Sequence, residues 1–398
     1  MVKLEERVHK LRVGVIFGGR SGEHEVSLAS ATSVIKALDP AKYEIIPIAI
    51  AKSGRWSAGE EVLDKLKTHQ EGTPALLNLD PADHGLYLRD GNGAFLRTLS
   101  LDVIFPVLHG PFGEDGTIQG LFELMDIPYV GCGVLGSAMA MDKIIQKHIC
   151  RQQGIPTIDF LWFRDVDWRE NGHAPLPRPS LPDQLANRSN QEIVTTLIEK
   201  LGLPLFIKPP NLGSSLGINK AHNEREIYNA IEDALQYDRK VLVEKAVPHP
   251  REIELSVLGN EHPRVSVACE IFPSNEFYDY DAKYVDGKSG STIPAALSPA
   301  QLKALQDTAI RAYIATEIEG MARADFLMER ETGRFFLSEL NTIPGFTRIS
   351  MYPKMWEASG LPYPELLDEL IALALRRQER RRALRTSYQP KKEWYARE

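Results

Sequence analysis

The sequence has few cysteines. Only Cys132, Cys150 and Cys269 occur among its 398 residues, and no two of them form a Cys-x-x-Cys pair. This spacing excludes the common zinc and redox motifs, and it does not suggest a disulfide framework. We therefore expect three buried, reduced thiols, which fit a reducing compartment.

Long hydrophobic runs are also absent. The apolar stretch from Val13 to Phe17 is too short for the hydrophobic core of a signal peptide, and no later segment reaches the length that spans a bilayer. Together with the reduced thiols, these absences predict a cytoplasmic protein without a membrane segment.

The chain lacks an excess of positive charge. Its net charge is −7, which is not typical of a nucleic-acid-binding protein. Basic residues gather only near the end, at 376–377, 380–382 and 391–392. We expect a solvated helix end there, followed by a loose basic tail at 386–398; a contact with phosphate or RNA is the alternative.

What is present is ordinary globular composition and an alternation of strand and helix patterns. A chain of this length predicts two or three domains of about 100–200 residues each. In the first, assigned to residues 1–142, apolar strands alternate with helical periodicity, which predicts a parallel, doubly wound sheet. The expected strands are 12–17, 43–49 and 101–108, and the expected helices are 23–38 and 117–125.

Two further domains are expected, at residues 143–244 and 245–385. The central one has predicted helices at 143–153, 191–201 and 223–237, strands at 160–164, 205–208 and 240–244, and an exposed loop at 170–190. The C-terminal one has predicted strands at 252–258 and 265–272, a helix at 299–318, a hairpin of 321–330 with 334–340, and a final helix at 364–385.

A glycine-rich loop follows the predicted strand 205–208. Its sequence, KPPNLGSSLG, begins at Lys208 and contains Ser214 and Ser215. Small residues let backbone N–H groups approach phosphate oxygens, and the lysine adds a positive charge. The Gly-Lys-Ser/Thr ending of a Walker A motif is missing. The loop favours nucleotide binding over a plain surface turn.

The predicted hairpin brings polar residues together on apolar strands. Alternate residues of a strand share a face, so Arg323 points the same way as Asp325, and Glu339 the same way as Asn341. Two carboxylates and an amide oxygen suit Mg²⁺ shared with substrate phosphates. The alternative is an ion cluster without a metal, in which Arg323 is the counter-charge.

Weaker signals lie on either side of these two motifs. The strand ending in Glu244 and Lys245 fits either an adenine contact or a salt bridge at the sheet edge. The aromatic and charged loop 275–284 resembles a lid, from which Lys283 can reach a γ-phosphate, or an ordinary packed loop. The turn at Pro344 and Gly345 offers backbone N–H groups to an oxyanion, or is simply a turn.

Two more loops follow strands in the N-terminal domain, at 18–25 and 109–116. Ligands of open parallel sheets bind beyond the carboxyl ends of the strands, so both loops are candidates for a binding site. The first lacks the Gly-x-Gly-x-x-Gly spacing, which argues against NAD.

Taken together, these segments resemble the D-alanine–D-alanine ligases of the ATP-grasp superfamily, from about Arg12 to about Leu375. The resemblance is carried by GGRSGEHEVSL, HGPFGEDGTIQG, MDK, KPPNLGSSLG, VEK, EFYDYDAKY, RADF and ELNTIPGFTRIS. It implies an α/β (α+β) fold in three parts, in which an N-terminal doubly wound sheet joins two mixed or antiparallel sheets that clasp ATP.

The resemblance also implies roles around ATP. Lys143 and Lys208 contact phosphates near Ser215, Glu252 holds the ribose, and Lys283 reaches the γ-phosphate. The implied adenine site consists of Glu244, Lys245, Val247 and Phe277. Asp325, Glu339 and Asn341 match magnesium ligands, for two ions that Mn²⁺ can replace.

The resemblance implies the following roles on the amino-acid side: Glu23 holds the ammonium group of a first D-alanine beside His109. Ser214 and Tyr284 link to Glu23 and close the lid. Arg323 and the Gly345 N–H bind the oxyanion, and Ser350 and Met351 bind the carboxylate of a second D-alanine. The implied activity joins two D-alanines, through D-alanyl phosphate, for peptidoglycan synthesis and cell-wall shape. A homodimer is implied as well.

Three alternatives remain open at this point. The first is a sister ligase that makes D-alanyl-D-lactate or D-alanyl-D-serine. A tyrosine at position 284 of the lid is similar to the dipeptide-forming enzymes, which favours D-alanine as the second substrate. Another ATP-grasp carboxylate–amine ligase is the second alternative, against which the Glu23 and Tyr284 segments count. The third is a nucleotide-binding module without catalysis, against which the full set of expected ligands argues.

Overall fold

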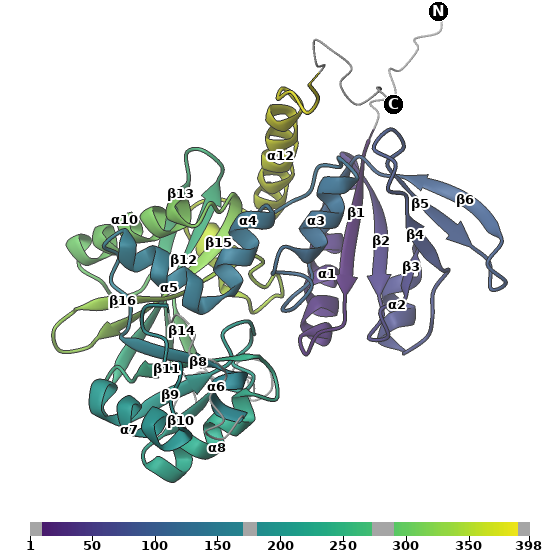
Figure 1. The fold of residues 1–398 in the computed structure, drawn as a ribbon. Coiled ribbons are helices and arrows are strands. Elements are labelled where there is room, and N and C mark those ends of the chain that lie inside the picture. Colours follow the sequence, from purple (N-terminus) through teal and green to yellow (C-terminus); the bar gives the residue numbers. More distant parts are fainter. Residues whose placement is uncertain (1–9, 170–180, 273–289, 389–398) are drawn as a thin grey trace, which may run out of the picture.

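The computed structural model describes residues 10–169, 181–272 and 290–388. Most of the predicted 170–190 loop, the predicted lid and the last part of the basic tail lie outside these residues. The described chain forms three main sheets that follow one another along the sequence, in the order of the three predicted domains (Figure 1). The domain boundaries themselves stay predictions.

The N-terminal sheet has the strand order β3-β2-β1-β7. Its centre is β1 (Leu11–Gly18), which pairs in parallel with β2 (Tyr43–Ile50) and with β7 (Val103–Pro106). The middle of β1 is fully buried, as expected of a central parallel strand. The parallel pairing is confirmed, although β7 is shorter than the predicted strand 101–108. The sheet is accompanied by α1 (His24–Ala37) and α3 (Thr117–Leu124).

Residues 51–100 contain elements that the sequence analysis missed. They are β3 (Trp56–Ala58), α2 (Val62–Lys67) and a small antiparallel sheet of β4 (Ala75–Leu77), β5 (Gly85–Arg89) and β6 (Phe95–Ser100). The turn between β5 and β6 reads Asp-Gly-Asn-Gly, a typical hairpin signal. Its Asp90 accepts hydrogen bonds from the backbone of Asn92 and Ala94.

The central sheet is antiparallel, with strand order β10-β9-β11-β8. Its strands are β8 (Phe160–Arg164), β9 (Leu205–Lys208), β10 (Asn219–Ala221) and β11 (Lys240–Lys245). Helices α7 (Asn190–Leu201) and α8 (Glu224–Ala234) pack against it, and short α6 (Asp165–Arg169) follows β8. A capping box of Ser189 and Glu192 starts α7 one residue earlier than predicted.

The C-terminal sheet is antiparallel too, with strand order β14-β13-β12-β15-β16. Its strands are β12 (Pro250–Gly259), β13 (Arg264–Phe272), β14 (Gly290–Thr292), β15 (Gly320–Glu329) and β16 (Phe335–Asn341). Helix α10 (Pro299–Ala315) packs against β12 and β13. Helices α4 (Val134–Met141) and α11 (Met351–Ala358) were not predicted, whereas α5 (Lys143–Gln152) was.

The last helix, α12 (Tyr363–Arg382), joins the N-terminal body to the C-terminal sheet, and Figure 1 shows it between them. Its apolar side shares one core with β1, β7 and Met321 of β15. The predicted solvated helix end is therefore only partly right, because several arginines are ion-paired. Arg380 pairs with Glu261, Arg381 with Glu123, and Arg382 with Asp126.

Arg377 makes the most buried of these contacts. Its guanidinium donates to the backbone oxygens of Gly131 and Tyr129, at 2.8 Å for Tyr129, and lies over the Tyr129 ring. Arg377 thus satisfies two carbonyl groups in the segment that leaves the N-terminal sheet. These contacts favour a structural role for the arginines of α12 over binding of phosphate or RNA.

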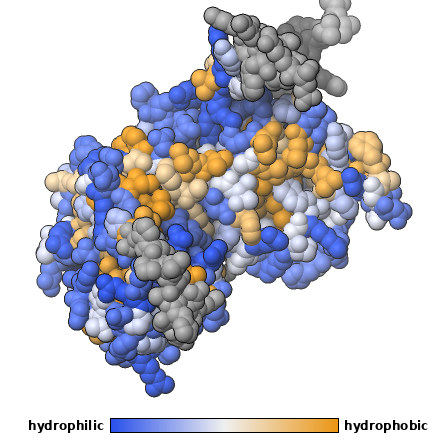
Figure 2. Space-filling model, in the orientation of Figure 1, coloured by the Kyte–Doolittle hydropathy of each residue, from blue (hydrophilic) through white to orange (hydrophobic). Residues whose placement is uncertain are grey.

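Among the described residues, no helix combines the length and apolar character needed to cross a bilayer. On the face drawn in Figure 2, hydrophilic residues predominate, and hydrophobic residues form separate patches.

We predict that Arg377→Ala destabilises the protein by about 3 kcal/mol, because two buried carbonyl oxygens lose a charged donor. The free energy of unfolding in urea is the measurement. Its matched control is Arg376→Ala, since Arg376 is the exposed neighbour on the same helix. Equal unfolding free energies for the two variants would contradict the role given to Arg377.

Candidate active site

Two adjoining cavities lie where the three sheets meet. Their common wall consists of Lys143, Glu254, Arg323 and Glu339. The described residues predicted for the amino-acid side all line the first cavity, together with one predicted metal ligand: Glu23, His109, Ser214, Arg323, Asn341, Gly345, Ser350 and Met351. Those predicted for the nucleotide side, together with the other two metal ligands, all line the second: Lys143, Lys208, Ser215, Glu244, Lys245, Val247, Glu252, Asp325 and Glu339.

Glu23 stands at one end of the first cavity, just before α1. It is buried, and the Ser214 hydroxyl of the glycine-rich loop donates to it. Two glycines make this approach possible. A Cβ atom at Gly110 or Gly213 would lie 2.7 or 2.6 Å from Glu23 Oε2, closer than side chains tolerate. The loop and the N-terminal domain therefore meet at the Glu23 carboxylate, which a larger residue at either glycine would displace.

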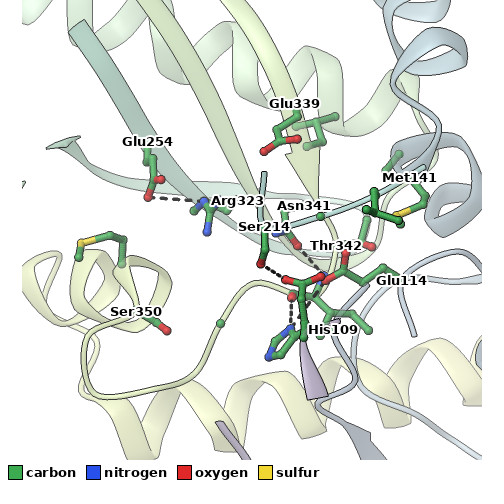
Figure 3. Close-up of a pocket in the computed structure, with 18 of the residues that line it drawn as sticks. His109, Glu114, Met141, Ser214, Glu254, Arg323, Glu339, Asn341, Thr342 and Ser350 are labelled. Atoms are coloured by element: carbon green, nitrogen blue, oxygen red, sulfur yellow. Dashed lines mark hydrogen bonds and ion pairs between the residues drawn. The ribbon is translucent and has the colours of Figure 1, made fainter. Parts of the chain in front are cut away.

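His109 and Glu114 extend this acidic end (Figure 3). The buried His109 ring has Nδ1 3.0 Å from Ile343 O and Nε2 3.0 Å from Ser30 Oγ. Because a carbonyl oxygen only accepts, Nδ1 carries the proton. Glu114 Oε1 lies 3.7 Å from the same nitrogen. Burial raises the pKa of Glu114 to about 7, although His109 opposes the rise.

Glu114 was not among the predicted site residues. It lies in the HGPFGEDG segment, but its burial beside Glu23 depends on contacts between elements distant in sequence. With Glu23 it makes one end of the cavity acidic, while Lys143 and Arg323 offer cationic groups on a wall that also contains Glu254 and Glu339. The acidic end suits an ammonium group and the two cationic side chains suit a carboxylate, so the cavity can take a zwitterion.

The hairpin of β15 and β16 arranges the predicted metal ligands as expected. Asp325 is directly opposite Glu339, and Arg323 is opposite Asn341. Arg323 donates through Nε and Nη2 to the two oxygens of Asp325, at 2.7 Å each. Each carboxylate therefore has a cationic partner, since Lys143 Nζ lies 3.1 Å from Glu339 Oε2.

These residues fit a divalent ion by their chemistry. Asp325 and Glu339 are oxygen donors on neighbouring strands, and both line the cavity that also contains Lys208. In the described part of the chain, no three His, Cys, Asp or Glu residues cluster as a metal site. A third protein ligand would therefore be an amide oxygen, such as that of Asn341, which accepts a hydrogen bond from Ile343 N.

The nucleotide side contains a buried ion cluster, of which only Glu244 and Lys208 were predicted from the sequence. Glu244 of β11 lies between two lysines, with Oε2 2.5 Å from Lys208 Nζ and Oε1 2.5 Å from Lys147 Nζ. Burial opposes ionisation, but the two ammonium groups outweigh it and lower the pKa of Glu244 to about 2. Lys147 was not predicted, although it lies one helical turn after Lys143 on α5.

The segment after β16 closes the first cavity. Ser350 precedes α11, and its hydroxyl oxygen accepts from Thr347 N at 3.0 Å. A Cβ atom at Gly345 would lie 2.5 Å from Ser350 Oγ, so a larger residue there would displace the Ser350 hydroxyl. The backbone N–H groups at the start of a helix attract anions, which suits the carboxylate predicted for this position.

Three predicted residues, Phe277, Lys283 and Tyr284, lie outside the described residues. Their roles in adenine binding, phosphate binding and lid closure stay predictions.

The fold is that of the ATP-grasp ligases, which confirms the predicted fold class. The chain belongs to the D-alanine–D-alanine ligase family. The family model "D-ala D-ala ligase N-terminus" matches residues 12–132, and "D-ala D-ala ligase C-terminus" matches residues 149–372.

Named relatives and solved structures agree with this family assignment. A D-alanine–D-alanine ligase of Thermoanaerobacter sp. (strain X514) is 49% identical, covering 92% of this chain and 97% of the relative. The solved D-alanine–D-alanine ligase from Coxiella burnetii has a TM-score of 0.78 at 35% identity, covering 94% and 96% of the two chains. A D-Ala:D-Ser ligase from Enterococcus faecalis has a TM-score of 0.76 at 35% identity, covering 92% and 100%.

We predict that Gly213→Ala weakens amino-acid binding, because the added methyl group displaces the Glu23 carboxylate. The measurement is the KM of the first amino acid. We expect it to rise by about tenfold, which is typical when a residue that supports a ligand-binding side chain is changed. Gly120→Ala is the matched control, since a Cβ at Gly120 meets no atom within 4 Å. An unchanged KM in Gly213→Ala would show that the close approach to Glu23 has no consequence for binding.

Proposed function

We propose that this protein is a D-alanine–D-alanine ligase, which converts ATP and two D-alanines to D-alanyl-D-alanine, ADP and phosphate. The observation that carries this proposal is the wall shared by the two cavities. Arg323 and Lys143 face both cavities, so the carboxylate of an amino acid in the first lies next to phosphate groups in the second. Family membership supports the same assignment.

In the first step, Glu23 holds the ammonium group of one D-alanine, and Arg323 and Lys143 receive its carboxylate. A carboxylate oxygen attacks the γ-phosphorus of ATP in line, and the bond to the β–γ bridging oxygen breaks. The products are D-alanyl phosphate and ADP. Lys208 and Lys143 contribute by holding the phosphate oxygens in position.

In the second step, the amine of a second D-alanine attacks the carbonyl carbon of the acyl phosphate. The N-terminus of α11, with Ser350 and Met351, holds the carboxylate of this second substrate. Arg323 and the Gly345 N–H stabilise the tetrahedral oxyanion, and removing one such donor typically costs about 10²–10³ in rate. Collapse of the intermediate forms the peptide bond and releases phosphate.

A divalent cation belongs to this proposal as well. Asp325, Glu339 and Asn341 are the residues that would hold it, and Mg²⁺, as two ions, is our assignment, with Mn²⁺ as a substitute. Bound there, the metal neutralises charge on the phosphate oxygens.

The cellular setting is also proposed. The three cysteines are free and buried, which supports a reducing compartment and hence the cytoplasm. We assign the product to peptidoglycan precursor synthesis and the protein to a homodimer, both from family resemblance. We keep the domain boundaries 1–142, 143–244 and 245–385 and the tail 386–398.

A D-alanyl-D-serine ligase is the second candidate, because one of the similar solved structures is a D-Ala:D-Ser ligase. The two activities differ only in the second substrate, so a competition assay distinguishes them. Phosphate release is measured with D-alanine alone and with D-alanine plus D-serine, D-lactate or L-alanine, and product masses are determined. We expect one D-alanyl-D-alanine per phosphate; a predominant mixed product would transfer the assignment to a sister ligase.

We predict that Asp325→Asn abolishes this phosphate release, because it removes the charge that Asp325 contributes to the metal site while preserving the size of the side chain. The matched control is Asp307→Asn, which alters an exposed residue of α10 and leaves the rate unchanged. A variant at Asp325 with full activity would exclude it as a metal ligand.

A further inference from the structure

A residue outside both cavities completes the nucleotide site. The side chain of Lys147 in α5 is 1% exposed. The side chains of Glu244 and Lys208, which belong to the same ion cluster, are 3% and 10% exposed. Glu244 and Lys208 line the nucleotide cavity, whereas Lys147 is not among its lining residues. Lys147 therefore contacts the lining of the cavity through its ion pair with Glu244.

The charges of this cluster do not balance. Lys208 and Glu244 alone would neutralise each other, because their ammonium and carboxylate groups are 2.5 Å apart. A lysine fully paired in this way offers little attraction to phosphate. The second ammonium group, 2.5 Å from the other carboxylate oxygen, adds a positive charge to the cluster, although burial lowers the pKa of Lys147.

The fold places these three groups together. Leu242 is opposite Lys208 in the pairing of β9 with β11, so Lys208 and Glu244 lie diagonally on one face of the sheet. Lys143 and Lys147 are one turn apart on α5, and neighbours at this spacing lie on the same side of a helix. Lys143 reaches Glu339 of the C-terminal sheet, and Lys147 reaches Glu244 of the central sheet.

We propose that Lys147 is a positioning residue for ATP, which holds Glu244 ionised and in place so that Lys208 remains available to phosphate. This inference rests on the proposed function of the nucleotide cavity. Lys147 does not touch the nucleotide. Its contribution is the positive charge that it places 2.5 Å from Glu244, one of two clustered residues that line the cavity.

The test is Lys147→Met, which keeps the length of the side chain and removes its charge. We expect the KM for ATP to rise by about tenfold or more, which is typical when a residue that supports a ligand-binding side chain is removed. The KM for D-alanine stays the same. The matched control is Lys200→Met, on an exposed position of α7, which changes neither value.

A double-mutant cycle with Glu244→Gln separates positioning from general stability. If Lys147 acts through Glu244, Lys147→Met changes the KM for ATP by less than about twofold once Glu244 is glutamine, because the two substitutions remove one interaction. Additive effects would overturn the proposal. So would a Lys147→Met protein that melts at a lower temperature but keeps its KM for ATP.

A replacement variant and a binding measurement cover the two cases in which the first experiment gives no answer. If Lys147→Met does not fold, Lys147→Gln takes its place, since its amide can donate to Glu244 without a charge. If the unmodified protein makes no dipeptide, the proposed function fails, and calorimetric binding of ATP with Mg²⁺ to the unmodified protein and the variant still decides the inference. Equal affinities there would overturn it.

Discussion

The site depends on two lysine–carboxylate pairs that join the sheets, one of them buried and the other partly exposed at Glu339. Burying a charge is costly, and a pair recovers that cost only when its geometry is good and its remaining polar atoms are satisfied. Lys143 links α5 to Glu339 of β16, and Lys147 links the same helix to Glu244 of β11. One helix thus connects the central and C-terminal sheets through two lysines, of which Lys143 lines the nucleotide cavity and Lys147 lies outside it.

Close packing at glycines sets the other boundary of the site. The glycine-rich loop approaches the N-terminal domain at Glu23, where a side chain at Gly110 or Gly213 would displace the carboxylate. On the far side, α12 attaches the N-terminal body to the C-terminal sheet through Arg377 and a shared apolar core. The amino-acid cavity is therefore formed by parts of the chain that are held together independently of any ligand.

Local patterns in the sequence were enough to predict much of this arrangement. Strand alternation and the hairpin predicted that the face of Arg323 and Asp325 lies beside the face of Glu339 and Asn341, and the apolar run at 12–17 predicted a strand of a parallel sheet; the structure has both. Glu114 and Lys147 could not be found this way, because their importance comes from burial against residues far away in the chain. The hairpin of β5 and β6 was detectable from its Asp-Gly-Asn-Gly turn, but its short strands have weak periodicity.

The predicted roles of individual residues remain proposals, because they concern reaction steps. The most direct test of the central claim, that the two cavities meet where carboxylate attacks phosphate, is isotope transfer. D-alanine labelled with ¹⁸O in its carboxylate is turned over with ATP, and the released phosphate is analysed by mass. The account predicts one ¹⁸O atom from the substrate in each phosphate, because the acyl phosphate breaks at its carbonyl carbon. Unlabelled phosphate would contradict it, since the carboxylate would then never have been bonded to phosphorus.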